Sequence, residues 1–157
     1  MEKAVIKTPL GNAEIIGDVN GISKIHILDK DIEITTEFSK ELKQAVEELQ
    51  DYFDGKRSTF SFKMNPTGTE FQKKVWQELL KIPYGKTYSY LELSIKLDNV
   101  KAIRAVATAN GKNPLWIVIP CHRVIGSDGS LTGYAGGLLR KKWLLDHENP
   151  VKQESLF

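Results

Sequence analysis

The only cysteine of the chain, Cys121, lies in the sequence Ile119-Pro120-Cys121-His122-Arg123-Val124. A lone cysteine cannot form a disulfide within the chain. The thiolate is the nucleophilic form of cysteine, and a neighbouring histidine or another cation favours it. Because His122 and Arg123 directly follow Cys121, this segment is a candidate nucleophilic site. The alternative is a small buried hydrophobe, since free cysteines are among the most buried residues.

The composition indicates a globular protein that needs no cofactor. A chain of 157 residues with 41% hydrophobic residues can bury a core as one or two domains. Three scattered histidines, His26, His122 and His147, give no metal-ligand spacing. The sequence has neither a signal-like apolar segment nor a run of about 18 apolar residues. We therefore expect a cytoplasmic monomer without metal, cofactor or membrane contact.

Charge is distributed unevenly along the chain. Residues 1–65 carry 9 Lys and Arg against 12 Asp and Glu, whereas residues 66–157 carry 13 against 8. A basic C-terminal half favours a polyanionic partner such as nucleic acid, although a scattered excess of charge is also common on an ordinary solvated surface.

The first 65 residues predict a small α/β domain. Short apolar runs within residues 4–34 alternate with turn signals, as in antiparallel hairpins. Apolar residues at helical spacing predict a helix over 40–52 that is capped by Ser39. Residues 59–63 alternate like one more strand. The turn-forming residues that follow place a domain boundary between 65 and 66.

The next segment has the pattern of a helix-turn-helix unit. Helices are expected over 69–80, 89–97 and 101–110, and the second begins with the capping-box spacing of Ser89 and Glu92.

The third of these helices carries alanines at positions 102, 105 and 109, which form a face with small side chains. Such a face allows close approach to another surface, and tight packing against a neighbouring helix explains it equally well. Residues 115–119 form a buried, strand-like run that leads into Cys121. A last helix is expected from Gly136-Gly137 through His147, and residues 150–157 form a tail.

The chain from about residue 66 to 149 resembles the active domain of the O6-alkylguanine-DNA alkyltransferases, which repair DNA by direct reversal. The matching segments occur in one order and are Tyr88-Ser89-Tyr90, Arg104-Ala105-Val106, Asn113-Pro114, residues 119–124, residues 133–138 and residues 143–148. The resemblance implies an α/β protein in which a mostly helical, winged helix-turn-helix active domain follows a small ribonuclease H-like α/β domain of residues 1–65.

The resemblance also implies a methylated-DNA-[protein]-cysteine S-methyltransferase that works once. An alkyl group on O6 of guanine in double-stranded DNA would pass to Cys121, and O4-alkylthymine is a further candidate substrate. Displacement at an sp3 carbon calls for a soft nucleophile rather than a water-activating metal. The resulting thioether has no carbonyl for water to attack, so the protein is expected to be consumed.

The family assigns a role to each matching catalytic residue. Cys121 is the acceptor, His122 deprotonates it through a water molecule, and Glu148 orients the histidine. Asn113 braces the active-site turn. Tyr90 donates a hydrogen bond to a ring nitrogen of the departing guanine, which gains negative charge.

Other residues are expected to form the pocket for the base. Main-chain carbonyls of Cys121 and Val124 would accept from the exocyclic amine, and the main-chain amide of Ala135 would face O6. Tyr134 resembles a pocket wall. Trp116 lies near the expected pocket and is predicted to restrict bulky adducts.

A base within a duplex is out of reach, so the nucleotide must be flipped out of the stack. Arg104 corresponds to the arginine that fills the vacated space. Ala102, Ala105 and Ala107 would lie in the minor groove, where small side chains permit close approach, and Arg123 is assigned to DNA contact.

Two other classes of protein fit parts of the pattern. A cysteine hydrolase would also use Cys-His-Glu, but it would turn over with water. A non-catalytic winged-helix protein could recognise lesions or regulate transcription, although the presence of Cys121 argues against it.

The tail carries a further motif in Gln153, Leu156 and Phe157. It is similar to the Gln-x-x-Leu-Phe pattern with which bacterial repair and replication proteins dock onto the sliding clamp. A disordered tail with a chance match, or a Leu-Phe pair folded back onto the domain, is the alternative.

Overall fold

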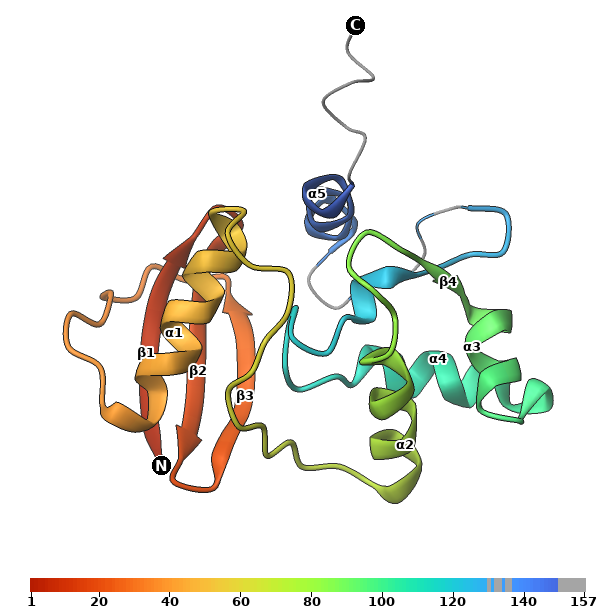
Figure 1. Cartoon of the computed structure of the whole chain (residues 1–157), viewed down its shortest axis with the longest axis horizontal. Coiled ribbons are helices and arrows are strands. Elements are labelled where there is room, and N and C mark those ends of the chain that lie inside the picture. Colours follow the sequence, from red (N-terminus) through yellow and green to blue (C-terminus); the bar gives the residue numbers. More distant parts are fainter. Residues whose placement is uncertain (130, 132–133, 135–136, 150–157) are drawn as a thin grey trace, which may run out of the picture. The chain divides into compact units, whose positions relative to one another are not determined.

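The computed structural model describes residues 1–129, 131, 134 and 137–149. It divides into two compact units (Figure 1). The first unit contains residues 1–67 and 114–118, and the second contains residues 68–113 and the described residues from 119 onward. The return of 114–118 to the first unit was not predicted from the sequence.

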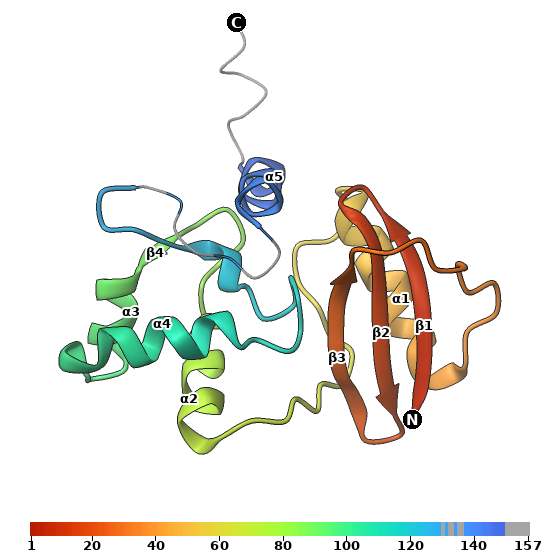
Figure 2. The ribbon, with the colours of Figure 1, turned by 180° about the vertical axis from the view of Figure 1, so that it is seen from behind.

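The first unit is a three-stranded antiparallel sheet covered on one face by a helix (Figures 1 and 2). Its strands are β1 (Glu2–Thr8), β2 (Gly11–Asp18) and β3 (Gly21–Leu28), in the order β1-β2-β3. The helix is α1 (Lys40–Phe53), which buries Leu42, Ala45, Val46 and Leu49. The hairpins expected within residues 4–28 and the helix are therefore confirmed, whereas the apolar run at 32–34 is not a strand. Ser39 is the N-cap residue of the helix, but its side chain makes no capping hydrogen bond.

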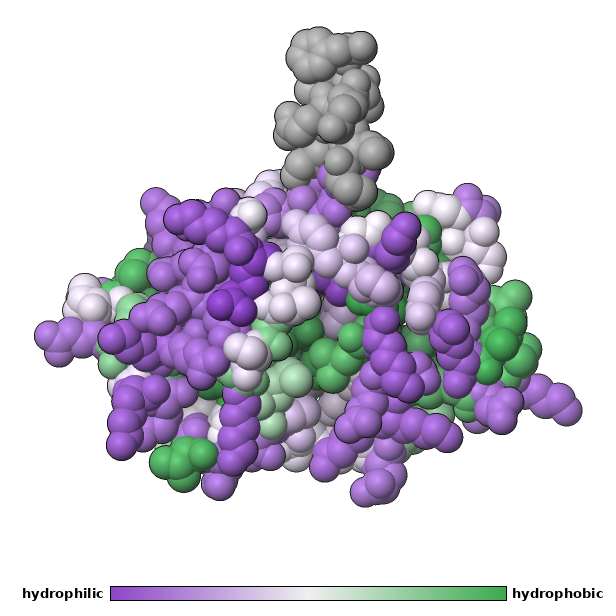
Figure 3. Space-filling model, in the orientation of Figure 1, coloured by the Kyte–Doolittle hydropathy of each residue, from purple (hydrophilic) through white to green (hydrophobic). Residues whose placement is uncertain are grey.

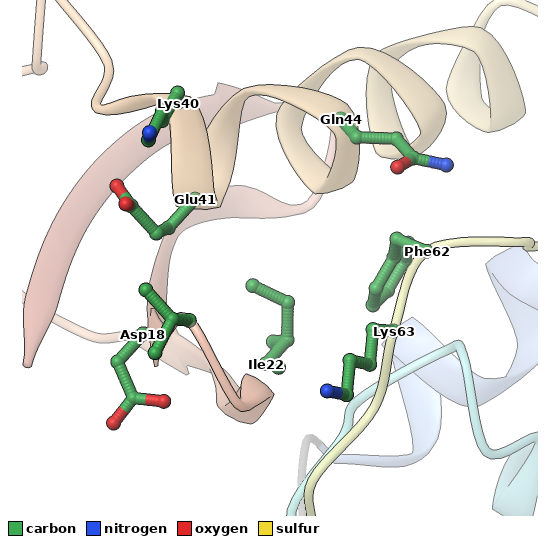
Figure 4. A pocket seen from close by; sticks show the side chains of 9 residues that line it. Asp18, Ile22, Lys40, Glu41, Gln44, Phe62 and Lys63 are labelled. Carbon is green, nitrogen blue, oxygen red and sulfur yellow. The ribbon is translucent and has the colours of Figure 1, made fainter.

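The outer surface of α1 is hydrophilic (Figure 3). Beside this helix, a pocket of about 310 Å³ opens between α1, the β2–β3 turn and residues 62–63 (Figure 4). Its charged lining residues are of both signs: Asp18 and Glu41 oppose Lys40 and Lys63. No cysteine or histidine lines this pocket, so it is not the nucleophilic site expected around Cys121.

Two further segments that alternate or run apolar in sequence are not strands, and those predictions were wrong. Residues 59–63 lead to an isolated bridge between Ile22 and Met64. The run at 115–119 is buried, but it pairs with β3 only at Leu115. It cannot remain extended because Ile117 adopts a left-handed φ of 73°, a conformation that a β-branched residue rarely takes.

The second unit is mostly helical. Its elements are α2 (Glu70–Leu79), β4 (Tyr88–Ser89), α3 (Tyr90–Lys96), the 3₁₀ helix η1 (Val100–Ala102), α4 (Ile103–Gly111), the 3₁₀ helix η2 (Cys121–Arg123), β5 (Val124–Ile125) and α5 (Leu138–Glu148). The expected helix-turn-helix is present, because α3 and α4 pack on each other. The capping box is also confirmed: Ser89 and Glu92 exchange two hydrogen bonds of 3.0 Å.

The two faces of α4 have different surroundings. Val106 and Ala109 are buried, and the carbonyl of Ala109 accepts a 2.9 Å hydrogen bond from the indole of Trp76 on α2. Arg104 and Ala105 are exposed. Ala109 therefore serves helix packing, whereas Ala105 lies on an open face. No helix in the described part of the chain is long and apolar enough to cross a membrane.

Candidate active site

Cys121 begins η2 directly after Pro120, and its side chain is almost entirely buried. The backbone turns tightly here, since the N–H of Cys121 donates to the carbonyl of Ile119 at 2.8 Å. The N–H of Val124 donates back to the carbonyl of Cys121 as η2 ends. These bonds fix the backbone on both sides of the thiol.

Asn113 braces this turn, as the sequence predicted. Its Nδ2 donates to the carbonyl of Ile119 and to Sγ of Cys121, at 2.6 and 3.2 Å. Asn113 lies two residues beyond the end of α4, so the helix positions the amide. A donor to the sulfur favours the thiolate, because hydrogen bonding to the charged form lowers a pKa.

The carboxylate of Glu148, at the end of α5, receives hydrogen bonds from two consecutive residues of η2. His122 Nε2 lies 2.8 Å from Oε2. The Nε and Nη2 groups of Arg123 donate to Oε1 and Oε2 at 2.7 and 3.1 Å. Both His122 and Glu148 are almost completely inaccessible to solvent. The expected histidine–carboxylate pair is thus brought together across 26 residues of sequence.

The environment of these groups decides their ionisation. Burial opposes ionisation of Glu148, but hydrogen bonds from His122 and Arg123 outweigh it and lower its pKa to about 2. Burial lowers the pKa of His122, although Glu148 acts to raise it. The lowered pKa favours a neutral imidazole. With Nε2 facing the carboxylate, Nδ1 is buried with no hydrogen-bond partner among the described residues. That nitrogen is the atom able to accept a proton.

Arg123 does not have the role expected for it. Only 6% of the residue is exposed. Besides its two bonds to Glu148, its Nη1 donates to the carbonyl of Ile82 at 2.8 Å. A guanidinium committed to a buried carboxylate and a main-chain carbonyl is not available to a phosphate. We therefore correct the assignment of Arg123 to DNA contact: the residue holds η2 against α5.

Tyr90 and Val124 are brought near each other by a short parallel pairing. Strand β4 pairs with β5, with Tyr88 opposite Val124 and Ser89 opposite Ile125. Tyr90 starts α3 directly after β4 and is partly exposed. The pairing places the start of this helix beside the strand that follows Cys121.

The remaining predicted pocket residues have different outcomes. Burial raises the pKa of the Cys121 thiol, and the Tyr134 hydroxyl is among the groups that act in the opposite direction. Trp116 is buried in the first unit, where its ring packs against Phe53 with centroids 6.2 Å apart. Ala135 lies outside the described residues, as do the tail residues Gln153, Leu156 and Phe157.

Sequence reasoning missed Lys141, a fully buried lysine of α5 whose charge acts on Cys121. A signal was available, because Lys141, Leu144 and Glu148 recur at the i, i+3, i+7 spacing of one helical face. In the described part of the chain, His, Cys, Asp and Glu side chains form no group of three able to hold a metal ion.

Two family models together match most of the chain. Residues 70–150 match the DNA binding domain of 6-O-methylguanine DNA methyltransferase, and residues 1–66 match its ribonuclease-like domain. The chain belongs to this family. It is a methylated-DNA–protein-cysteine methyltransferase of direct-reversal DNA repair.

Several relatives of this methyltransferase are similar over nearly the whole chain. The methylated-DNA–protein-cysteine methyltransferase of Methanosarcina barkeri is 44% identical over 92% of this chain and 94% of its own. That of Mycolicibacterium paratuberculosis is 40% identical over 99% and 97%. The crystal structure of Mycobacterium tuberculosis OGT in complex with DNA has a TM-score of 0.85 at 36% identity, and all of both chains is covered. The mixed α/β fold predicted for the chain is thereby confirmed.

The buried carboxylate should make the stability of the methyltransferase depend on acid. The pKa of Glu148 falls from 4.5 to about 2 on folding. The ionised carboxylate therefore contributes fully to the free energy of unfolding above the unfolded-state pKa, and this contribution is lost as the pH drops toward the folded-state pKa. Glu148→Gln should lower the free energy of unfolding at pH 7 by about 3 kcal/mol, because it leaves Arg123 without its partner. It should also flatten the decline of stability between the two pKa values.

Urea unfolding across pH measures both effects. Asp146→Asn is the matched control, since its carboxylate is 59% exposed and pairs with Lys142 on the surface of the same helix. Equal losses in the two variants would contradict the assigned role of Glu148.

Proposed function

We propose that Cys121 is the acceptor of the alkyl group and that each molecule of the methyltransferase reacts once. The observation that carries this proposal is the contact of Asn113 with the buried sulfur, beside a histidine held by a buried carboxylate. A non-catalytic lesion-binding protein has no need of this network. The substrate is O6-alkylguanine in double-stranded DNA, with O4-alkylthymine as a second candidate.

The reaction is a displacement at the alkyl carbon. A sulfur–carbon bond forms as the carbon–O6 bond breaks, and the electron pair of the broken bond stays on guanine. The proton lost by the thiol goes to His122 Nδ1 through a water molecule, and guanine regains a proton from its surroundings. Tyr90 donates a hydrogen bond to a ring nitrogen and stabilises the charge that develops on the leaving base.

The neutral state of His122 suits the first proton transfer. A buried imidazole whose pKa is lowered is free of its second proton before the reaction. The charge that it gains on accepting a proton is stabilised by the Glu148 carboxylate at 2.8 Å. The imidazole is therefore neutral and able to accept a proton before transfer, and the carboxylate stabilises the imidazolium that forms afterwards.

Helix α4 is proposed to enter the minor groove of the DNA. Arg104 is exposed and forms no ion pair within the described residues, so its guanidinium is available to fill the space left by a flipped base. Ala102, Ala105 and Ala107 lie on the same helix or at its cap and keep at least partial exposure. A monomer that acts on DNA in the cytoplasm is part of this proposal.

The acceptor is tested by Cys121→Ala. The variant should lose all alkyl transfer while its affinity for DNA stays close to that of the wild type, because phosphate contacts supply most of the affinity. Intact-protein mass spectrometry after incubation with a methylated oligonucleotide gives the answer. The wild type should gain one methyl group in a stoichiometric reaction, whereas repeated turnover with water would indicate a hydrolase. A methylated Cys121→Ala protein would refute the assignment.

The role of Arg104 is tested by comparing two substrates. Arg104→Ala should slow repair of duplex DNA by about tenfold or more and leave the reaction with free O6-benzylguanine unchanged, since only the duplex needs a base held out of the stack. Lys112→Ala is the matched control, because Lys112 is an exposed cation that ends the same helix. It should weaken affinity for DNA modestly without a comparable loss of the rate at saturating DNA. Equal losses of Arg104→Ala on both substrates would contradict the proposed role.

We also propose that the tail residues Gln153, Leu156 and Phe157 dock the protein onto a sliding clamp. Short motifs of this kind insert apolar anchors into a preformed groove, while a glutamine supplies directional hydrogen bonds. The motif lies beyond the end of α5 and outside the proposed active site in sequence, so docking and transfer are expected to be separable.

A clamp pull-down with the purified full-length protein tests this proposal. Leu156→Ala combined with Phe157→Ala should abolish retention, because both apolar anchors are removed, whereas transfer to a short oligonucleotide should be unchanged. Glu154→Ala and Ser155→Ala are matched controls at the variable positions of the motif and should be retained like the wild type. Equal retention of the double variant, or no retention of the wild type, would refute clamp docking.

A further inference from the structure

Exposed apolar side chains concentrate around the helix-turn-helix of the second unit. Of the eleven large hydrophobic residues that are exposed in the described part of the chain, four lie within residues 91–103. They are Leu91, Ile95, Val100 and Ile103. Figure 3 shows hydrophobic surface over the part of this unit where Figure 1 labels α3. Single exposed apolar residues are ordinary, but a concentration of them indicates a binding surface.

Two of these residues lie where the chain enters α4. Val100 begins η1, and Ile103 is the first residue of α4, directly before Arg104. Residues three positions apart lie on the same side of a helical turn, so Val100 and Ile103 are neighbours. Val106 and Ala109 are buried on the opposite face of α4. The exposed side of this segment therefore carries an apolar pair beside the guanidinium of Arg104.

The charge of the segment indicates that its partner is a polyanion. Residues 100–112 contain Lys101, Arg104 and Lys112 and no acidic residue. All three cations are exposed. The segment also lies within the residues that match a DNA binding domain. A groove of DNA has phosphates at its edges and less polar sugars and base edges between them, so it matches both the cations and the apolar pair.

Ile103 is a bulky residue on a face that otherwise carries small side chains. Ala105 and Ala107 keep at least partial exposure and permit close approach of α4 to the minor groove. The side chain of Ile103 does not fit at the same separation unless it enters the groove. A β-branched side chain in a helix is largely confined to one rotamer, so it cannot simply turn away. Its position next to Arg104 places it at the base step beside the flipped nucleotide.

We propose that Ile103 is an apolar wedge that enters the minor groove and loosens the base step beside the flipped nucleotide. The inference rests on the proposed entry of α4 into that groove. Apolar side chains inserted at a base step weaken its stacking and open the groove. Ile103 thereby favours extrusion of the damaged base, and Arg104 fills the space that the base leaves. Ile103 is a positioning residue, because it acts on the DNA stack and takes no part in alkyl transfer itself.

The wedge is tested by comparing two substrates of Ile103→Ala. The variant should slow repair of duplex DNA at saturating concentration by about fivefold or more, because extrusion of the base becomes less favourable. Its reaction with free O6-methylguanine should be unchanged, since a free base needs no unstacking. That second result also shows that the variant is folded. Ile103→Leu keeps an apolar side chain of the same size and should retain most of the wild-type rate on duplex DNA.

Leu80→Ala is the matched control. Leu80 is 42% exposed and Ile103 is 37% exposed, but Leu80 lies at the end of α2 and not on α4. Its substitution should leave repair of duplex DNA unchanged. An Ile103→Ala rate on duplex DNA that equals the rate of Leu80→Ala would overturn the proposal.

A second measurement reports stacking directly. A duplex carries 2-aminopurine next to O6-methylguanine, and its fluorescence rises when the stacking of this base is lost. The protein is Cys121→Ala, so that binding is not followed by transfer. Adding Ile103→Ala should reduce the rise in fluorescence at DNA-saturating protein, whereas adding Leu80→Ala should not. Equal rises with and without the Ile103 side chain would exclude a wedge.

The outcomes separate this inference from the proposed function on which it rests. If α4 does not enter the groove, Arg104→Ala and Ile103→Ala will both leave duplex repair unchanged, and the two proposals fail together. If Arg104→Ala slows duplex repair and Ile103→Ala does not, the wedge alone is overturned. Slower repair in both variants, with rescue by Ile103→Leu, is the expected result.

Discussion

The buried carboxylate of Glu148 is the interaction on which the active domain depends. It joins the end of α5 to two consecutive residues of η2, through His122 and through the Nε and Nη2 groups of Arg123. Neither the carboxylate nor the guanidinium can be left alone in the interior, because an unpaired buried charge costs several kcal/mol. The turn that carries Cys121 and the helix that follows it must therefore assemble together. The same contact fixes the direction of the His122 ring.

This arrangement separates the charges that hold the fold from the groups that act on the thiol. Arg123 is committed to Glu148 and Ile82, so its cation contributes to structure. Burial raises the pKa of the Cys121 thiol above its ordinary value, and the Asn113 amide and the Lys141 charge offset this effect only in part. A thiolate held by a few fixed groups rather than by bulk water is poorly solvated. Such an environment favours attack on an alkyl carbon by replacing mobile solvent with preorganised partners.

Features set by residues close in sequence could be predicted, whereas features set by residues far apart in sequence could not. The helices were predictable because periodicity and the Ser89–Glu92 capping box are local signals. The resemblance found Cys121, His122 and Glu148 because their motif is specific. The role of Arg123 was missed, since its partners Ile82 and Glu148 are 41 and 25 residues away and adjacency to Cys121 favoured a functional reading. The strand expected at 115–119 failed for a similar reason, because apolar content does not reveal the left-handed turn at Ile117.

In the proposed mechanism, helix α4 links DNA recognition to chemistry through its two ends. Arg104 lies in its first turn on the exposed face, while Val106 and Ala109 anchor the opposite face, where Trp76 holds the carbonyl of Ala109. Just beyond its last residue, Asn113 donates both to the turn before Cys121 and to the sulfur. A helix is stiff over this length, so a displacement at one end must be accommodated at the other. The position of the exposed face, which is proposed to bind DNA, and the position of the amide on the thiol are therefore set by the same packed element, so a change in one is expected to affect the other.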